Sequence, residues 1–265
     1  MISDYTGIPW RDSLAKAEAA AKKALELDST LAQPHAVLAS PRELAWDWAG
    51  AEREYRKALE LDPGYATAHQ WYAQHLAEIG RLEEALAEAK RAQELDPLSL
   101  IINNVVADAL YTSRRYDDSI EQSRKTLALD PNFGVAHLTL GLTYVQKSMF
   151  QEALAELQTA AKLQPGQPSV MAALGYADAV TGRRAEALKI LDNLTARTGR
   201  GFTPYAEIAT VYIGLGDKDR AIEWLRKAVE QRSGSRMGLK SDPLFDPLRS
   251  DPRFTDLLRR VNLPP

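Results

Sequence analysis

Four histidines are the side chains best suited to metal binding or acid–base catalysis in this chain of 265 residues, which contains no cysteine. His35, His69 and His137 recur at intervals of 34 and 68 residues, as equivalent positions of successive structural units would. Packed helical layers lie roughly 8–10 Å apart, so three such imidazoles are too far apart to share one metal ion. His75 has no acidic residue at the spacing of a ligand pair. We interpret all four as packing or surface histidines and expect no metal site.

Paired acidic residues are the second candidate for chemistry. Glu83-Glu84 and Asp117-Asp118 could supply a general acid and a general base. Each pair begins an expected helix, where carboxylates stabilise the positive end of the helix dipole, and that structural role explains both pairs. The sequence contains no glycine-rich phosphate loop, nucleophile elbow or zinc-protease motif. Without cysteine it also lacks thiol catalysis and cysteine-ligated zinc. We therefore expect a protein that is not an enzyme and binds no cofactor.

The charge balance argues against two classes of partner. The chain has 33 basic and 36 acidic side chains and a formal net charge of −3. This composition lacks the basic surface of a nucleic-acid-binding protein. No apolar run approaches the roughly 20 residues that span a bilayer, and the first ten residues do not resemble a secretory signal. We expect a cytoplasmic chain with no nucleic-acid or membrane partner.

The elements that would position any site follow a period of 34 residues. Proline recurs at this interval, at Pro63, Pro97, Pro131 and Pro165. Two ladders of small residues keep the same register, Ala17, Ala51, Ala85, Ser119, Ala153, Ala187 and Ala221 in one and Ala39, Ala73, Ala107, Gly141, Gly175 and Ala209 in the other. The register continues without an insertion from about residue 12 to residue 230. Such a period indicates one supersecondary unit repeated along the chain.

Each period is expected to form two helices joined by a tight turn. From Ala66 to Ser99, apolar residues fall three and four positions apart, which is helical spacing. Gly80 separates two such runs and can supply the positive φ of a turn. Pro97 disfavours helix at the residue before it and so ends the second run. The ladders of small residues lie where the paired helices approach most closely.

This pattern resembles the tetratricopeptide repeat (TPR), a helix–turn–helix unit of 34 residues. The leucine position of the family is occupied by Leu38, Tyr72, Val106, Leu140, Leu174 and Ile208. The usual tryptophan is replaced, in order, by His35, His69, Asn103, His137, Met171 and Tyr205. The resemblance implies an all-α fold in which the repeats form an α–α superhelix, the TPR solenoid.

The repeat register predicts the domain organisation. One helical pair cannot cover its own apolar faces, so neighbouring pairs must stack. We expect an N-terminal half repeat at residues 1–31, six full repeats at residues 32–65, 66–99, 100–133, 134–167, 168–201 and 202–235, and a C-terminal capping segment at residues 236–265. Two explanations of the half repeat stay open: a divergent cap, or a chain cut from a longer protein.

Proline marks the irregular places. Pro41 falls inside the first helix of the first full repeat, and Ser40 and Glu43 around it have the spacing of a capping box. We therefore predict that this helix breaks and restarts at Pro41, and that Asp47 caps the next helix. In the C-terminal segment, Asp242-Pro243, Asp246-Pro247 and Asp251-Pro252 each predict the start of a short helix.

The C-terminal segment also suggests a parent protein. The stretch SDPLFDPLRSDPRFTDLLRRVNL looks like the ends of TPR regions in large bacterial signalling proteins. In those proteins such arrays follow a winged-helix DNA-binding domain, a serine/threonine kinase domain or a nucleotide-cyclase domain. The resemblance implies a docking or sensory part of a signalling or transcription-regulatory protein.

In TPR proteins the first helix of each repeat lines a concave groove that binds a protein or peptide. Carried over by position, the resemblance implies a groove formed by Gln70, Gln74, Asn104, Asp108, Tyr111, Leu138, Leu142, Val145 and Tyr176. The lining changes from amide-rich to apolar along the chain, which suits a peptide backbone at one end and apolar anchors at the other. The alternative function is self-association as a homodimer, through the apolar helix face that the half repeat leaves open.

Overall fold

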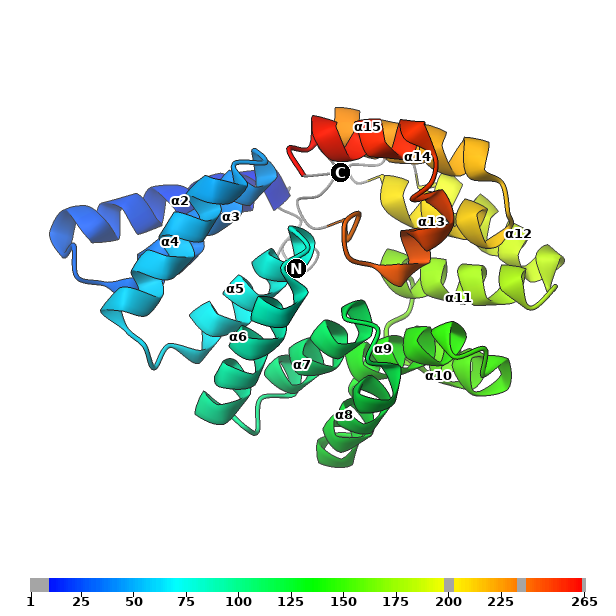
Figure 1. Cartoon of the computed structure of the whole chain (residues 1–265), viewed down its shortest axis with the longest axis horizontal. Coiled ribbons are helices and arrows are strands. Elements are labelled where there is room, and N and C mark those ends of the chain that lie inside the picture. The colour runs from blue at the N-terminus through cyan, green and yellow to red at the C-terminus, as the bar shows by residue number, and fades with distance from the viewer. Residues whose placement is uncertain (1–9, 198–202, 233–236, 264–265) are drawn as a thin grey trace.

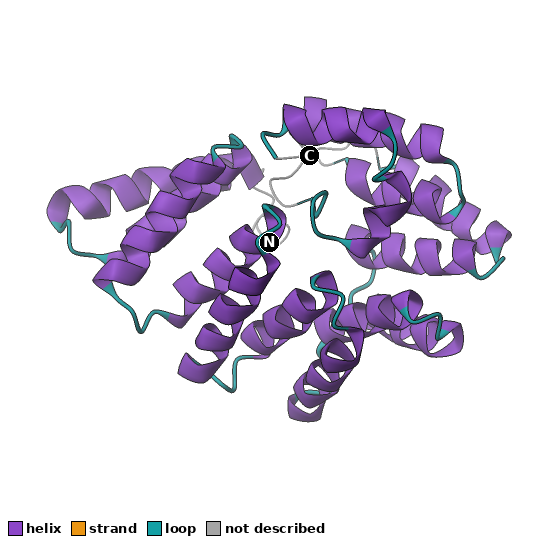
Figure 2. Ribbon diagram, viewed as in Figure 1, coloured by secondary structure: helices purple, strands orange, loops and turns teal. Residues whose placement is uncertain are grey.

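The computed structural model describes residues 10–197, 203–232 and 237–263, and within these ranges it contains helices and loops but no β-strand (Figure 2). A single helix, α2 (Trp10–Leu27), precedes six helical pairs. The pairs are α3 (Ala32–Leu44) with α4 (Trp48–Leu61), α5 (Ala66–Glu78) with α6 (Leu82–Leu95), α7 (Leu100–Thr112) with α8 (Tyr116–Leu129), α9 (Gly134–Gln146) with α10 (Phe150–Leu163), α11 (Pro168–Val180) with α12 (Arg184–Thr195), and α13 (Tyr205–Gly214) with α14 (Lys218–Glu230). The predicted all-α superhelix is confirmed.

Small residues hold the two helices of a pair close together, as the sequence predicts. Ala39 of α3 and Ala51 of α4 are fully buried, and so are Ala153 and Ala221 at equivalent positions of later pairs. At Gly141 of α9 an added Cβ would lie 2.6 Å from Cγ of Leu157 in α10. Because no larger side chain fits at this approach, the close packing of the helices depends on the small-residue ladders.

The turn inside each pair has the same backbone geometry in all six repeats. One residue per repeat has a positive φ, at Trp46, Gly80, Arg114, Ser148, Gly182 and Gly216. In the second repeat the turn closes through hydrogen bonds from Gly80 N to Ala77 O (3.0 Å) and from Arg81 N to Leu76 O (2.8 Å). Glycine adopts this conformation without strain, whereas tryptophan, arginine and serine do so at a cost. The packing of the helices therefore imposes the turn even where the residue disfavours it.

The predicted break at Pro41 is wrong, because α3 runs unbroken from Ala32 to Leu44. Pro41 lies in the last turn of α3, so it removes only one backbone hydrogen bond of the helix. Glu43 does not complete a capping box, because its carboxylate is buried and accepts hydrogen bonds from Tyr55 Oη (3.2 Å) and His75 Nδ1 (3.1 Å). The prediction for Asp47 is confirmed, since its side chain accepts a hydrogen bond from Gly50 N and caps α4.

The C-terminal segment continues as a 3₁₀ helix, η1 (Pro243–Leu248), and a last helix, α15 (Pro252–Arg260). Asp242 and Asp251 cap these two elements as predicted, by accepting hydrogen bonds from Leu244 N and Arg253 N. The prediction that Asp246-Pro247 opens a third helix is wrong, because both residues lie inside η1. α15 packs on α14 and η1 packs on α13, so the segment covers the last repeat.

The helical pairs follow one another around an arc, and the C-terminal segment brings its two ends together (Figure 1). Trp48 of the first full repeat donates its indole N–H to the backbone oxygen of Val261 (2.7 Å), and Asn262 donates to the backbone oxygen of Trp46 (3.2 Å). The guanidinium of Arg232 lies 4.6 Å from the centre of the Trp46 ring. The described part of the superhelix is thus closed into a ring by contacts between its first and last elements.

Candidate binding groove

The concave surface consists of the first helices of the repeats. Helices α3, α5, α7, α9, α11 and α13 each contact the next first helix directly, so they form a continuous inner layer of the arc (Figure 1). All nine residues that we expect in the groove lie on four of these helices, α5, α7, α9 and α11. Gln70, Asn104, Tyr111, Val145 and Tyr176 are at most 9% exposed. The other four, Gln74, Asp108, Leu138 and Leu142, are partly buried.

Part of this surface is covered by residues 237–248, which we call the crossing segment and which run along the inside of the arc. Gly238 N donates a hydrogen bond to Oε2 of Glu78 at the end of α5 (2.9 Å). Tyr111 Oη of α7 donates to Oδ1 of Asp242 (3.0 Å). Arg114, in the turn after α7, donates to Oδ1 of Asp246 (2.7 Å). Two repeats of the inner layer therefore bind this segment through side chains.

The apolar half of the predicted groove is covered in the same way. Val145 and Tyr176 belong to one hydrophobic cluster with Leu244, Phe245 and Leu248 of the crossing segment. Leu138 and Leu142 pack against that cluster. Burial of large apolar side chains contributes roughly 1.5–3 kcal/mol for each residue that is fully removed from water. The apolar residues predicted to anchor a partner thus belong to the same hydrophobic core as the chain's own C-terminal segment.

The crossing segment approaches the backbone of the inner layer closely at its start. Gly80 follows α5, and a Cβ added there would lie 2.8 Å from Cγ of Lys240. Gly238 has a φ of +66° and begins a turn that closes through a hydrogen bond from Asp242 N to Gly238 O (2.8 Å). A side chain at Gly238 would therefore strain the turn that aims Asp242 at Tyr111.

Two carboxyl groups meet in this interface, one from each side. Burial and, to a smaller extent, the negative charge of Asp242 together raise the pKa of Asp108 in α7 to about 7. Burial also raises the pKa of Asp242, against the opposing effects of its hydrogen bonds to Leu244 N and Tyr111 and of the charge of Arg249. The same burial raises the pKa of the Tyr111 phenol. Two facing carboxylates weaken the interface whenever both are ionised.

The side-chain oxygen of Asn104 is a second unfavourably buried polar group in the groove. Its side chain is 5% exposed, and within the described residues its Oδ1 has no hydrogen-bond partner. A buried amide oxygen without a partner costs roughly 1–3 kcal/mol, so a donor from a bound molecule would be favourable there.

The repeated histidines pair within their own repeats. Each accepts or donates a hydrogen bond through Nδ1 with a glutamate 19 residues further on, as the pairs His35–Glu54 (2.8 Å), His69–Glu88 (2.5 Å) and His137–Glu156 (2.5 Å) show. In the third repeat Asn103 and Gln122 occupy these positions and are joined by a hydrogen bond of 3.0 Å. In the sixth, the rings of Tyr205 and Trp224 are 6.0 Å apart. The position therefore joins the two helices of a repeat by whatever complementary pair it holds.

His75 also has a structural environment. It is fully buried, bonded to Glu43 and surrounded by the rings of Trp48, Tyr55 and Tyr72. Among the described residues, no group of three or more histidine, aspartate and glutamate side chains is arranged to hold a metal ion. None of the helices in the described ranges combines the length and the apolar character that crossing a bilayer requires.

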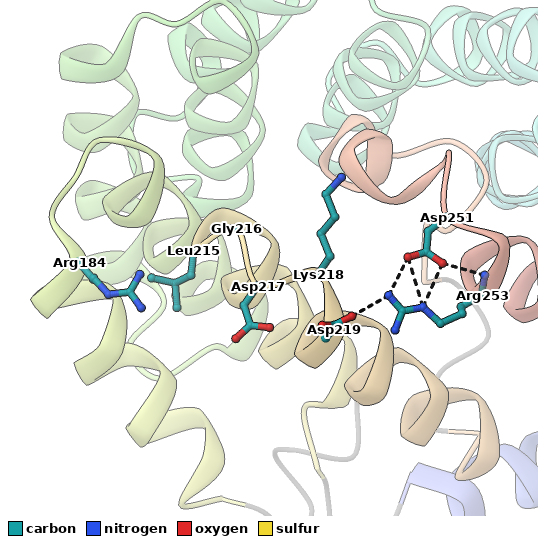
Figure 3. Close-up of a pocket in the computed structure, with 8 residues that line it drawn as sticks. All are labelled: Arg184, Leu215, Gly216, Asp217, Lys218, Asp219, Asp251 and Arg253. Atoms are coloured by element: carbon teal, nitrogen blue, oxygen red, sulfur yellow. Dashed lines mark hydrogen bonds and ion pairs between the residues drawn. The ribbon is translucent and has the colours of Figure 1, made fainter.

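An open depression of about 560 Å³ lies at the turn between α13 and α14, outside the predicted groove (Figure 3). Four of its charged side chains have structural partners. Arg253 contacts Asp219 and Asp251 at 2.8 Å each, and Asp217 caps α14 through Arg220 N. Because these charges neutralise one another, we assign no ligand to the depression.

Sequence reasoning missed Arg114 and the crossing segment as parts of this surface. The Asp-Pro pairs were visible as helix caps, but a cap depends only on neighbouring residues. The partner of Asp242 is 131 positions away in the sequence. No local pattern indicates such a contact.

Comparison with known proteins supports the assignment of tetratricopeptide repeats. Models of the tetratricopeptide repeat match residues 45–107, 106–168 and 203–233, which together make up more than half of the chain. No curated protein sequence matches the chain.

Solved structures resemble the chain in fold. The human IFIT1 dimer with m7Gppp-AAAA is 17% identical, with a TM-score of 0.66, over 94% of this chain and 65% of that one. The anaphase-promoting complex hetero-tetramer Cut9–Hcn1 is 18% identical, with a TM-score of 0.66, over 94% and 46%. PilW, a type IV pilus biogenesis factor, is 21% identical, with a TM-score of 0.57, over 75% and 92%. At these identities the likeness extends to the fold alone.

Proposed function

Because the chain belongs to the tetratricopeptide repeat family, we propose that it is a non-catalytic scaffold that binds a protein partner on the concave surface of its first helices. The observation that carries this proposal is the crossing segment itself. The inner layer holds this polypeptide through Glu78, Tyr111 and Arg114 and through an apolar cluster. A surface with a side-chain acceptor, side-chain donors and apolar contacts is chemically suited to a peptide.

The lining of the groove supports a peptide rather than a nucleic acid. Its polar end carries Gln70, Gln74, Asn104 and Asp108, and its apolar end carries Leu138, Leu142, Val145 and Tyr176. The structure of human IFIT1 was determined with a capped RNA. In this chain the formal net charge is −3, and neither end of the groove offers the cluster of basic side chains that phosphates require.

The parent context is the finer part of the proposal. The stretch from residue 241 to residue 263 resembles the ends of TPR regions in bacterial signalling and transcription-regulatory proteins. That resemblance supports a role as the docking or sensory part of such a protein. Self-association through α2 stays a prediction, since α2 packs on α3 and no observed contact favours a dimer.

Site-specific photo-crosslinking in native cells tests the groove. A photoreactive amino acid replaces Gln74, which lies on the inner helix α5, or Lys125, which is exposed on the second helix α8. We expect an intermolecular protein adduct from position 74 and none from position 125. Asn104→Ala in the same background should reduce the adduct without changing the helical circular dichroism.

Two results would contradict the proposal. One is an adduct only from position 125, which would move binding to the outer face. The other is an adduct that nuclease removes, which would replace the protein partner by a nucleic acid.

A further inference from the structure

The crossing segment binds the concave surface as a ligand would, at three successive points. Glu78 accepts the backbone N–H of Gly238, Tyr111 donates to Asp242, and Arg114 pairs with Asp246. These contacts lie on the inside of the arc, whereas α15 packs on α14 (Figure 1). The segment that fills the groove is therefore distinct from the helix that caps the last repeat.

The chemistry of the segment is compact and specific. Asp242 presents a carboxylate to the Tyr111 hydroxyl, and Pro243 starts η1 directly after it. Leu244 and Phe245 follow and are 5% and 3% exposed within the apolar cluster. The acidic residue thus pairs with one hydroxyl donor of the inner layer, and the two large apolar residues after the proline join the apolar cluster.

The charges of the crossing segment and of the inner layer are not fully complementary. Asp108 faces Asp242, so the segment brings a carboxylate toward another carboxylate. Burial and the nearby charge of Arg249 also lower the pKa of Lys240. Both effects disfavour the charged form of this lysine in the bound segment. Burying charged groups without full compensation weakens binding. The hydrogen bonds and apolar contacts hold the segment, while the repulsion between Asp108 and Asp242 reduces its affinity, as a removable occupant requires.

We propose that residues 237–248 are a built-in competitor for the concave surface, and that the partner carries an extended segment of the same chemistry: an acidic residue and proline followed by two large apolar side chains. This inference rests on the proposed function, because it specifies which partner the groove accepts and what the partner must displace. It predicts that the surface becomes available when the crossing segment leaves it.

A binding titration with the full chain tests the competition. The probe is a fluorescent peptide with the sequence of residues 237–248, MGLKSDPLFDPL, and its control is a scrambled peptide of equal composition. Asp242→Ala removes the bond to Tyr111 and the cap on Leu244. It should raise the affinity for the peptide by about tenfold or more, because a surface that is nine-tenths occupied binds a competitor about ten times more weakly than a free one.

Asp251→Ala is the matched control. Asp251 also caps a helix that starts with proline, but it contacts Arg253 rather than the groove. We expect this variant to bind the peptide like the wild type. Adding Tyr111→Phe to Asp242→Ala should lower the affinity again, since it removes the donor that the peptide's own aspartate needs. If Asp242→Ala loses helical circular dichroism, Asp246→Ala takes its place. This variant removes an exposed contact with Arg114 and should raise the affinity for the peptide by a smaller factor.

The outcomes separate this inference from the proposed function. If the peptide binds Asp242→Ala no better than wild type or Asp251→Ala, the segment is a permanent part of the fold and the inference is wrong, while a partner crosslinked at position 74 would keep the proposed function. A gain in peptide affinity without any partner at position 74 would support the inference about the groove and contradict the proposed scaffold.

Discussion

Tyr111 and Asp242 are 131 residues apart in the sequence, and a hydrogen bond of 3.0 Å joins the phenol of one to the carboxylate of the other. Tyr111 lies on the first helix of the third repeat, and Asp242 caps η1 in the crossing segment. The bond connects the concave surface to the chain's own C-terminal segment. Access to the groove therefore depends on a contact between two distant parts of the chain.

The first prediction concerns pH. Asp108 has a pKa of about 7, against 3.8 for an unburied aspartate, and it is faced by Asp242 and by Tyr111. Asp246 and Arg249 are the charged groups next to Asp242. A raised folded-state pKa means that the folded protein binds more protons than the unfolded one between these two values. The free energy of unfolding should therefore fall as pH rises from about 4 to about 7, on the order of 4 kcal/mol for this group.

Urea unfolding at pH 5 and pH 7.5 measures this effect, with Asp108→Asn as the control. The asparagine carries no charge at either pH, so its variant should lose less stability than the wild type over this interval. An equal loss in both proteins would show that Asp108 does not cause the dependence.

The second prediction concerns helix packing. Gly141→Leu places a side chain where Leu157 already lies, at a Cβ distance of 2.6 Å from its Cγ. Overpacking should lower the free energy of unfolding by about 1–3 kcal/mol or more. Ala155→Leu in α10 is the control, because Ala155 is exposed and has room for a larger side chain. Thermal melts of both variants test this prediction. An unchanged melting temperature for Gly141→Leu would contradict the close approach of α9 and α10 at this position.

The third prediction concerns the positive-φ turns. Ser148 has a φ of +57° and is exposed, so Ser148→Gly should raise the free energy of unfolding by about 1 kcal/mol. Gly182 occupies the equivalent turn one repeat later, with a φ of +80° and nothing within 4 Å of an added Cβ. Gly182→Ala should therefore lower stability by a similar amount through conformation alone. Chemical denaturation of the two variants should give shifts of opposite sign, and shifts of the same sign would contradict the explanation.

The fourth prediction concerns the pair that joins the helices of a repeat. His69 and Glu88 are 2.5 Å apart, and hydrogen bonds to Glu88 and to the Pro63 oxygen raise the pKa of His69 although burial opposes the shift. His69→Asn and Glu88→Gln should each destabilise the repeat, while the double variant recreates the pair that joins Asn103 to Gln122. A double-mutant cycle by urea unfolding should give a coupling energy of about 1 kcal/mol. Strict additivity would mean that the two positions do not interact.

Most of the local structure of this protein could be predicted from its amino-acid sequence. The 34-residue period placed every helical pair, and Asp47, Asp242 and Asp251 were recognised as caps, because helix propensity and capping depend on residues within a few positions of one another. The prediction at Pro41 failed for an instructive reason. Ser40 and Glu43 have the spacing of a capping box, but Glu43 bonds to His75, 32 residues away, and helix packing keeps α3 continuous.

The segment that covers the groove could not be predicted and is seen only in the folded chain. The nine predicted residues lie on the inner helices as the repeat register required, yet that register leaves open how far each repeat rotates against the next. Small rotations add up over six repeats, and their sum brings Trp48 to Val261 and carries Asp242 to Tyr111. A contact that depends on the accumulated geometry of the whole array leaves no signal in any short stretch of sequence, because no short stretch contains both of its partners.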